Sequence, residues 1–281
     1  MNFVMTGHKG LIGSSLLERL IERGDKPILL ADKRTGTNIR DMDSIKTEEP
    51  IDVVYHLASF CKINQCIANP EKNFQDNVIG THKVLEFCRQ NKIPKIVFTS
   101  SSRVLCKEKN PYTASKLYGE ELVKGYAGAY GMDYSIIWPS TVYGPFNDLS
   151  KRLADIFIIN ALEGKELKIF GDKNKTLDFT YVDDFVNGLL LATEQSNSSY
   201  VVSSGKSESV SDIADEIIRL AGQGKKAFYN PETAQPQKVN LDISPLKALG
   251  YEPKVFAKEG IANTFEWYKD NFKKIKESRE S

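Results

Sequence analysis

The stretch "TGHKGLIG" occupies residues 6–13, directly after the apolar residues "MNFVM" that open the chain. Its glycines stand at positions 7, 10 and 13 and lead into "LIGSSLLERLIERG", where apolar residues recur at helical spacing. Gly7 permits a tight turn, Gly10 lets a pyrophosphate approach the backbone, and Gly13 lets a helix pack closely on a strand. A merely tight turn is the alternative. The strand before and the helix after favour a dinucleotide-binding unit.

The alternation of strand and helix continues beyond this unit. Short apolar runs rich in β-branched residues are "KPILLAD", "DVVYHLAS", "KIVFTSSS" and "YSIIWPS", and longer amphipathic stretches separate them. Repeats of this kind predict an α/β protein of the Rossmann type, with a doubly wound parallel sheet covered by helices on both faces.

After about residue 145 the regular alternation lapses. We expect residues 1–145 to form a dinucleotide-binding domain, to which residues 176–206 return. Residues 146–175 and 207–281 are expected to form a smaller, mostly C-terminal lobe that binds the substrate. A cleft between two lobes is a common place for a substrate.

Composition excludes several classes of function. The 281 residues are 41% hydrophobic and carry a net charge of +1, which provides no long-range field for nucleic acid or an anionic membrane. The 4 cysteines form no CxxC pair and the 3 histidines are scattered, so we expect no metal site. No apolar run approaches the roughly 20 residues of a membrane span, and the chain opens on a strand. We expect a cytoplasmic protein with free thiols.

A carboxylate follows the second apolar run, about 20 residues after the glycine turn. At that position Asp32 can accept hydrogen bonds from the hydroxyls of an adenosine ribose. A 2′-phosphate would meet a like charge there, which favours NAD over NADP. Lys33 and Arg34 keep NADP open as the alternative.

The stretch "NPYTASKLYG", residues 110–119, places Tyr112 and Lys116 on one face of a predicted helix. An ammonium near the phenol is expected to lower the pKa of the tyrosine from about 10 toward neutrality. Ser101 ends an apolar strand at the sheet edge where such folds bind ligands. The three side chains predict a site that removes a proton from a secondary alcohol while its hydride passes to a nicotinamide.

Taken together these motifs resemble the extended short-chain dehydrogenase/reductase family, the nucleotide-sugar epimerases and dehydratases. The resemblance runs nearly end to end, through "TGHKGLIG", "DVVYHLAS", "DNVIGTHKVLEFC", "FTSSS", "YTASK", "PSTVYGP", "FGDKNKTLDFTYVDD" and "LGYEP". It implies Ser101, Tyr112 and Lys116 as catalytic residues. It also implies a homodimer, paired through helices around residues 74–91 and 113–131.

The resemblance assigns further residues to ligands. Asn38 and Ile39 are expected to contact adenine, and Pro139 to Val142 to lie beside the nicotinamide. The expected NAD contacts are Gly7, Lys9, Gly10, Leu11, Ile12, Gly13, Asp32, Lys33, Asn38, Ile39, Leu57, Ala58, Ser59, Asn77, Ser100, Tyr112, Lys116, Pro139 and Val142. The expected substrate contacts are Lys62, Ser102, Arg103, Thr141, Lys175, Leu177 and Gln235.

Three arginines usual in relatives are missing. Leu177 and Gln235 stand where arginines usually bind a diphosphate, which leaves Lys173, Lys175 or Lys238 as substitutes, or means a different headgroup. A third usual arginine, in the strand before "VYGP", is Trp138 in this sequence, either a core residue or a surface on which a ring packs.

Two further departures lie between Ser101 and Tyr112. Dehydratases of the family carry acidic residues directly after the catalytic hydroxyl, where this chain has Ser102 and Arg103, so elimination of water lacks its acid and base. Arg103 is either a solvated or capping residue or a contact to an anionic substrate. The loop, which includes Cys106, is about half the usual length and predicts a more open pocket.

The sequence therefore favours an NAD-dependent epimerase of a nucleotide sugar that acts by transient oxidation at the sugar 4-position. The alternatives are a one-way reductase or dehydrogenase of a keto sugar or another small alcohol, a 4,6-dehydratase, and a non-catalytic NAD sensor. A sensor has no need of Ser101, Tyr112 and Lys116 together.

Overall fold

The computed structural model describes residues 1–147, 152–231 and 241–280. Its larger lobe is built on a six-stranded sheet in the order β2-β1-β3-β4-β5-β9, in which every neighbouring pair is parallel. The strands are β1 (Asn2–Thr6), β2 (Lys26–Ala31), β3 (Val53–His56), β4 (Lys95–Thr99), β5 (Asp133–Pro139) and β9 (Ser198–Val202). The predicted doubly wound parallel sheet is confirmed.

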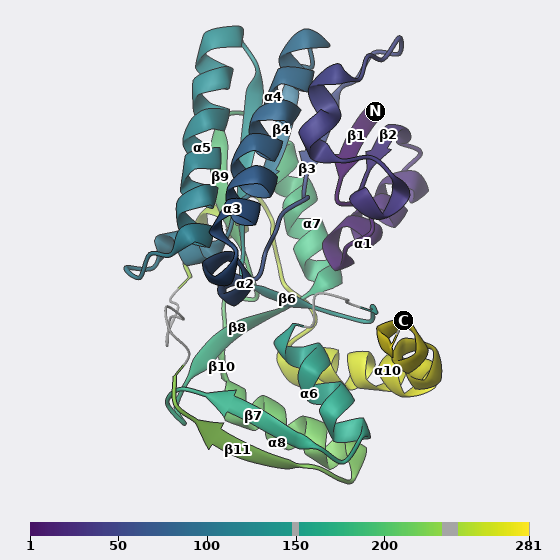
Figure 1. The fold of residues 1–281 in the computed structure, drawn as a ribbon, viewed down its shortest axis with the longest axis vertical. Helices are drawn as coiled ribbons and strands as arrows, with labels where there is room; N and C mark the ends of the chain where they lie inside the picture. The colour runs from purple at the N-terminus through teal and green to yellow at the C-terminus, as the bar shows by residue number, and fades with distance from the viewer. Residues whose placement is uncertain (148–151, 232–240, 281) are drawn as a thin grey trace.

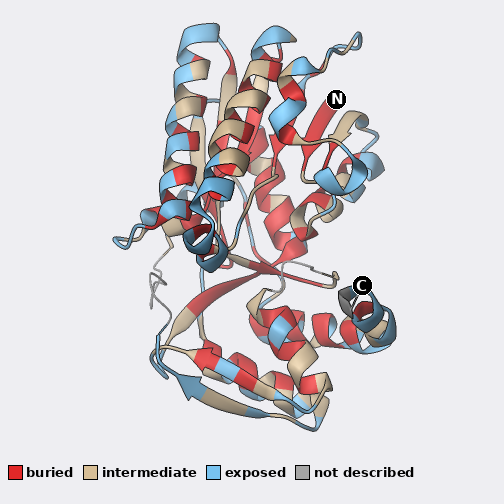
Figure 2. Cartoon of the chain, viewed as in Figure 1, coloured by how far each residue is buried: buried red, intermediate tan, exposed pale blue. Residues whose placement is uncertain are grey.

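Helices cover both faces of this sheet (Figure 1). One face packs on α1 (Leu11–Glu22) and α7 (Val182–Thr193), and the other on α4 (Gly80–Gln90) and α5 (Pro111–Tyr130). An apolar core lies between the sheet and the helices on each face. The central strands β1, β3 and β4 are buried almost throughout (Figure 2). Strands buried on both faces explain why the apolar runs in the sequence are continuous and do not alternate.

The strand order reverses beside β1. The chain passes from β1 to β2 on one side and then to β3 on the other, so the loops after β1 and β3 diverge. Thr6 pairs with His56 at the carboxyl ends of these strands. A reversal of this kind opens a crevice at the carboxyl edge of the sheet, where open α/β sheets bind ligands.

Short helical segments fill the connections on this edge. They are η1 (Lys33–Thr35), η2 (Ile39–Ser44), α2 (Ile63–Ala68), α3 (Pro70–Asn73), the π-helical turn η3 (Phe74–Ile79) and η4 (Ser102–Leu105).

The smaller lobe faces the carboxyl edge of the large sheet (Figure 1). A three-stranded sheet in the order β10-β8-β6 leads into it, and β11 pairs with β7 at its far side. Its strands are β6 (Thr141–Tyr143), β7 (Glu166–Phe170), β8 (Thr176–Tyr181), β10 (Ser207–Ser209) and β11 (Lys225–Tyr229). Its helices are α6 (Leu153–Leu162), α8 (Val210–Ala221) and α10 (Ala257–Glu280), which share one apolar core with β7 and β8.

One segment of the C-terminal part packs with the larger lobe. The side chains of Ile243, Leu246 and Tyr251 belong to the core that contains α7, and α9 (Ser244–Lys247) lies within this segment. The phenol of Tyr251 donates to the carbonyl oxygen of Ser203, 3.1 Å away. The segment therefore packs beside β9, the last strand of the large sheet.

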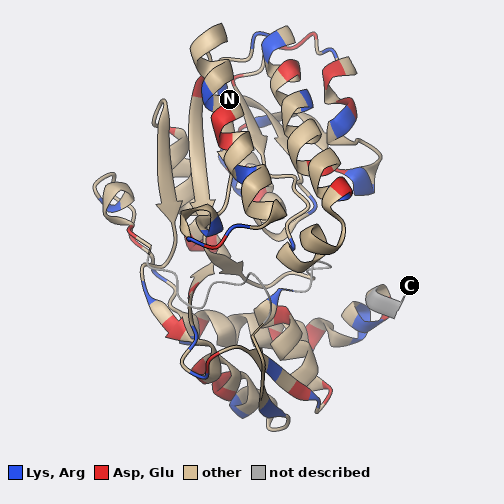
Figure 3. Cartoon of the chain, turned by 60° about the vertical axis from the view of Figure 1, so that its left-hand side comes forward, with Lys and Arg blue, Asp and Glu red and all other residues tan. Residues whose placement is uncertain are grey.

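The surface carries both signs of charge on the helices of both lobes (Figure 3). This distribution agrees with a net charge of +1. None of the described helices has the length and apolar character needed to cross a membrane.

Candidate active site

The glycine turn follows β1 and touches the end of β3. Gly7 has a φ of +77°, and a Cβ atom added to it would lie 2.8 Å from the backbone nitrogen of Ala58. A Cβ on Gly13 would lie 2.2 Å from the carbonyl oxygen of Gly7. Only glycine fits either position. A Cβ on Gly10 would meet only the Gly7 carbonyl oxygen, at 3.4 Å, so the protein's own packing does not demand this glycine.

The turn fits a dinucleotide. Gly10 is the N-cap of α1 and provides no side-chain cap, so the first N–H groups of the helix remain available to an anion. The space above Gly10 is the place where a side chain would obstruct a pyrophosphate. Leu11 is buried, Ile12 is half-buried, and Lys9 is exposed beside the turn.

Asp32 lies beside this turn at the end of β2, with 6% of its surface exposed. One carboxylate oxygen accepts from the backbone nitrogen of Lys9 at 3.2 Å, and both oxygens accept from the Arg34 guanidinium at 3.0 Å. Burial acts to raise the pKa of Asp32, but hydrogen bonds from Arg34 outweigh it and hold the pKa at about 2. The ionised carboxylate is thus ready to accept ribose hydroxyls, which must share it with Arg34. Lys33 is exposed.

A column of buried polar groups links the strands behind the turn. Thr6 Oγ1 accepts from the backbone nitrogen of Ala58 at 3.1 Å and bonds His56 Nδ1 at 2.8 Å. Thr81 donates to the carbonyl oxygen of Asn77 at 2.6 Å and bonds His56 Nε2 at 3.1 Å. His56 therefore accepts at Nδ1 and donates at Nε2. Burial lowers the pKa of His56 to about 3, so the ring is neutral.

Asn77 fixes the loop after β3. Its Oδ1 accepts from the backbone nitrogen of Phe60 at 2.7 Å and from Ser59 Oγ at 3.1 Å. Its Nδ2 donates to Asn73 Oδ1 at 2.8 Å and to Ser115 Oγ at 3.2 Å. Asn77 lies on the π-helical turn η3, a distortion that often accompanies functional sites. The expected cofactor residues Leu57, Ala58 and Ser59 are thus held against η3 and α5.

The start of α5 places the predicted catalytic tyrosine. Asn110 accepts from the backbone nitrogen of Thr113 at 3.0 Å, and Thr113 Oγ1 accepts from the backbone nitrogen of Asn110 at 2.9 Å. This capping box, with Pro111 as the first residue of α5, ends the loop and begins the helix within one turn. Tyr112 is therefore the second residue of α5, and Lys116 follows one turn later.

The structure brings the predicted catalytic side chains together at the carboxyl end of β4. Ser101, Tyr112 and Lys116 are 6%, 7% and 4% exposed. The side chain of Ser101 lies close enough to the phenol of Tyr112 to favour its ionised form. The ammonium of Lys116 donates to the carbonyl oxygen of Thr99 at 2.9 Å, so the lysine is tied to β4.

The expected lowering of the tyrosine pKa is not what this structure shows. Burial raises the pKa of Tyr112, and the nearby Ser101 side chain only partly offsets this effect. Burial also lowers the pKa of Lys116 to about 8. Both charged forms are penalised because the pair is almost completely removed from water. A tyrosine and a lysine one turn apart therefore do not establish a phenolate by spacing alone.

Glu120, one turn beyond Lys116, organises the wall behind the site. Its buried carboxylate accepts a hydrogen bond from Ser100 Oγ and another from Trp138 Nε1 at 2.8 Å. The Ser100 hydroxyl, expected to contact the cofactor, is therefore engaged with α5. Trp138 packs against both apolar cores of the large lobe. The core interpretation of Trp138 is confirmed.

Several other expected cofactor residues have side chains that are packed within the protein or hydrogen-bonded to its own backbone. Ile39 is 8% exposed and Val142 is completely buried, and both side chains lie in apolar cores. Asn38 caps η2 by accepting from the backbone nitrogen of Arg40 at 3.1 Å. Pro139 ends β5 and is half-buried.

The expected substrate residues are dispersed. Lys62 is the N-cap of α2, Thr141 begins β6, and Lys175 donates to the carbonyl oxygen of Phe170 at 3.2 Å. Leu177 is 5% exposed in the apolar core of the smaller lobe, so position 177 offers no polar group to a ligand.

The remaining expected substrate residues follow Ser101 or fall outside the description. Ser102 is 3% exposed, and the backbone nitrogen of Arg103 donates to Ser101 Oγ at 3.2 Å. Gln235 and Lys238 lie outside the described residues.

Some residues near the site carried no signal in the sequence. Glu120 reads as an ordinary helix-surface acid, and Arg152 as a loop charge. Arg152 is the N-cap of α6, and its charge acts to lower the pKa of Tyr112. Cys66 packs against Tyr112, and burial raises the pKa of its thiol to about 12, which makes it an unreactive neighbour.

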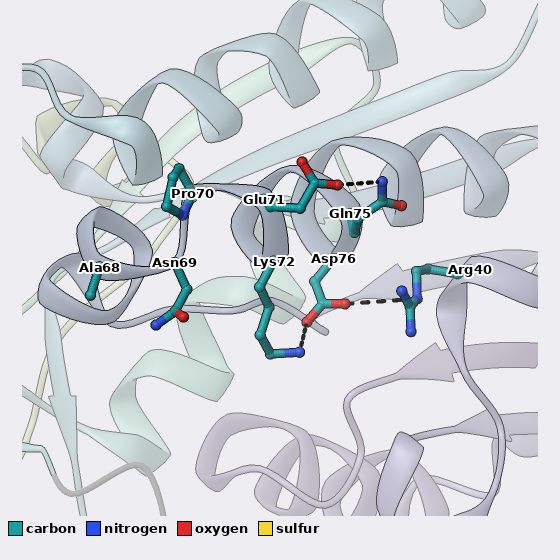
Figure 4. Close-up of a pocket in the computed structure, with 8 residues that line it drawn as sticks. All are labelled: Arg40, Ala68, Asn69, Pro70, Glu71, Lys72, Gln75 and Asp76. Atoms are coloured by element: carbon teal, nitrogen blue, oxygen red, sulfur yellow. Dashed lines mark hydrogen bonds and ion pairs between the residues drawn. The ribbon is translucent and has the colours of Figure 1, made fainter.

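A separate hollow of about 480 Å³ lies between η2 and the segment from α2 to η3 (Figure 4). Asp76 pairs with Lys72, one turn before it, at 2.7 Å, and with Arg40 of η2 on the other side of the hollow at 3.9 Å. These charges satisfy one another, and neither Ser101, Tyr112 nor Lys116 lines this hollow.

The chain matches the model of the NAD dependent epimerase/dehydratase family over residues 3–203. The chain belongs to this family. The family's cofactor is NAD, which confirms the predicted cofactor and agrees with the fit of the glycine turn and Asp32.

Two relatives and one solved structure illustrate the similarity. A putative UDP-glucose 4-epimerase of Methanocaldococcus jannaschii is 33% identical, with 95% of this chain and 98% of the relative covered. A UDP-glucuronate 4-epimerase of Thermodesulfobacterium geofontis is 30% identical, with 85% and 79% covered. The UDP-glucose 4-epimerase of Thermotoga maritima has a TM-score of 0.90 at 26% identity, with 97% and 100% covered.

We predict that alanine at one glycine of the turn lowers stability, and that alanine at another weakens NAD binding. Gly13→Ala should lower the free energy of unfolding by about 2 kcal/mol or more, because its methyl group meets backbone atoms. Gly10→Ala should leave stability nearly unchanged and weaken NAD binding. Urea unfolding and titration with NAD measure the two effects. Equal loss of stability in both variants would contradict the distinction.

The buried Lys116 should make stability depend on pH. Its pKa falls from 10.5 when unfolded to about 8 when folded, so between these values the unfolded chain binds more protons. Its contribution to folding should therefore rise with pH above about 8, by at most about 1.4 kcal/mol per pH unit. Urea unfolding of the wild type and of Lys116→Met from pH 7.5 to 9.5 tests this. Parallel pH dependences in the two proteins would contradict it.

Proposed function

We propose that this protein is an NAD-dependent epimerase of a nucleotide-activated sugar and acts by transient oxidation at the sugar 4-position. The observation that carries the proposal is that Ser101 lies close to Tyr112 in a buried site, with Lys116 anchored to β4 one turn along α5. Similarity to UDP-sugar 4-epimerases over nearly the whole chain supports it.

Tyr112 would accept the proton of the sugar hydroxyl, while Ser101 holds the same oxygen by a hydrogen bond. Lys116 would stabilise the phenolate that forms, because it follows Tyr112 by one turn on the same face of α5. NAD, held by the glycine turn and Asp32, would supply reversible hydride acceptance at the sugar carbon. Tyr112 would then give the proton back. Substrate and product therefore differ only in configuration, and no cofactor is consumed.

The dehydratase alternative finds little support at this site. Elimination needs an acid and a base beside the oxidised sugar. The positions after Ser101 hold Ser102 and Arg103, and Glu120 is engaged by Ser100 and Trp138 in the core.

A one-way reductase or dehydrogenase is the second candidate. Two features favour it, because each weakens the retention of a keto intermediate. The short connection between Ser101 and Tyr112 leaves the pocket more open, and the apolar Leu177 cannot bind a diphosphate. The amount of NAD converted to NADH during the reaction separates the two functions. Epimerisation should proceed with NAD far below the substrate concentration and without lasting absorbance of NADH.

Tyr112→Phe should reduce turnover by at least about 100-fold, because it removes the only proposed proton acceptor. NAD binding should persist, since the ring remains. Tyr118→Phe is the matched control, because Tyr118 lies on the same helix with 49% of its surface exposed. NMR of the sugar protons measures turnover. Undiminished activity in Tyr112→Phe would contradict the mechanism.

We also propose a homodimer formed through α4 and α5, which lie side by side on the outer face of the larger lobe (Figure 1). Tyr118 and Tyr130 on α5 are 49% and 57% exposed, as expected of aromatic side chains that a second subunit covers. Light scattering should give twice the mass of the chain, and Tyr118→Glu should lower it toward that of the monomer. A monomeric wild type would contradict the proposal.

A further inference from the structure

Arg103 is half-buried, and part of its guanidinium is removed from water. Its Nη1 atom is inaccessible and has no hydrogen-bond partner. Among the described residues, no carboxylate lies within ion-pair distance of Arg103. Burial lowers the pKa of Arg103, as expected when a charge loses water without gaining an acid. Such an arrangement costs stability, so a role in binding is a physical reason for keeping it.

The residue that carries this cation borders the reacting centre. Arg103 belongs to η4, which begins directly after Ser101, and its backbone nitrogen donates to Ser101 Oγ at 3.2 Å. Its charge acts on the phenol of Tyr112 and on the thiol of Cys106. The position of Arg103 is therefore fixed by the same hydroxyl that would hold the reacting oxygen of the sugar.

The chemistry of the missing partner follows from the guanidinium. An arginine presents parallel N–H donors in a planar fork, which matches the two oxygens of a carboxylate or a phosphate. A neutral hydroxyl would satisfy one donor and leave the charge uncompensated. The ligand of Arg103 should therefore bring an anionic group into the site.

The geometry of a pyranose decides which anion can reach it. If Ser101 and Tyr112 hold the oxygen on C4, the neighbouring ring carbons are C3 and C5. In an unmodified hexose C3 carries a neutral hydroxyl, whereas C6, attached to C5, can be a carboxylate. The diphosphate is attached to C1, across the ring from C4. For a sugar without an acidic group on its C3 oxygen, an anion that meets a cation beside Tyr112 is thus a carboxylate at C6.

We propose that the substrate is a nucleotide-activated uronic acid and that Arg103 binds its C6 carboxylate. This proposal rests on the proposed oxidation at C4 and deepens it by naming the class of sugar. Arg103 is accordingly a specificity-determining residue, and proton transfer stays with Tyr112.

The test compares UDP-glucuronate with UDP-glucose, which differ only at C6, in the wild-type protein and in Arg103→Met. The wild type should epimerise the uronate with a kcat/KM about 10- to 100-fold higher. Arg103→Met should lose most of that preference through a higher KM for the uronate. Lys107→Met is the matched control, because it removes an exposed positive charge from the same loop.

Comparing two substrates in one variant separates specificity from folding. Equal losses for both substrates in Arg103→Met would place the guanidinium on the diphosphate and overturn the proposal. A wild type that prefers UDP-glucose would overturn it too, while leaving the epimerase function intact. If the wild type epimerises neither sugar and also leaves other nucleotide sugars unchanged, the proposed function itself fails.

Thermal unfolding gives a second readout that needs no turnover. Without ligand, Arg103→Met should melt at the same temperature as the wild type or above it, because an unpaired and partly buried charge has been removed. In the presence of NAD, UDP-glucuronate should raise the melting temperature of the wild type and raise that of Arg103→Met much less. Equal shifts in the two proteins would overturn the assignment of the carboxylate to Arg103.

Discussion

The site depends on one column of hydrogen bonds that runs behind it, from Thr6 through His56 and Thr81 to Asn77. These groups are 0 to 3% exposed, and each bond joins a different segment of the carboxyl edge. Buried polar groups are costly unless satisfied, so the column permits essentially one register between β1, β3 and η3. The glycine turn, the loop after β3 and the start of α5 all take their positions from it, through Ala58 and Ser115.

The fold could be predicted from the sequence because its signals are local and repeated. Apolar runs, glycine turns and helix starts each reflect interactions within a few residues, and the structure confirms the parallel sheet they indicate. The candidate site could be predicted only in part. The spacing of Tyr112 and Lys116 predicts a shared helix face, but it gives no measure of the burial that raises the pKa of Tyr112 and lowers that of Lys116. Glu120 and His56 act through partners distant in sequence, which no local pattern reveals.

The proposed site lies where the structure accepts unfavourable burial. Lys116 is a nearly inaccessible ammonium whose bond goes to a carbonyl oxygen, and Arg103 has an inaccessible nitrogen with no partner at all. Elsewhere in the large lobe, buried charges such as Glu120 are satisfied by neighbours. A site that holds uncompensated positive charge beside a phenol is prepared for a ligand that becomes, or already is, negatively charged.

Transfer of deuterium from a nucleotide sugar labelled at C4 tests the central claim most directly. Oxidation and return at C4 predict that, with catalytic NAD, the epimer formed keeps its deuterium on C4 in an NMR spectrum. Deuterium that appears on C6, remains in reduced cofactor or is replaced from water would contradict the proposed chemistry at Ser101, Tyr112 and Lys116.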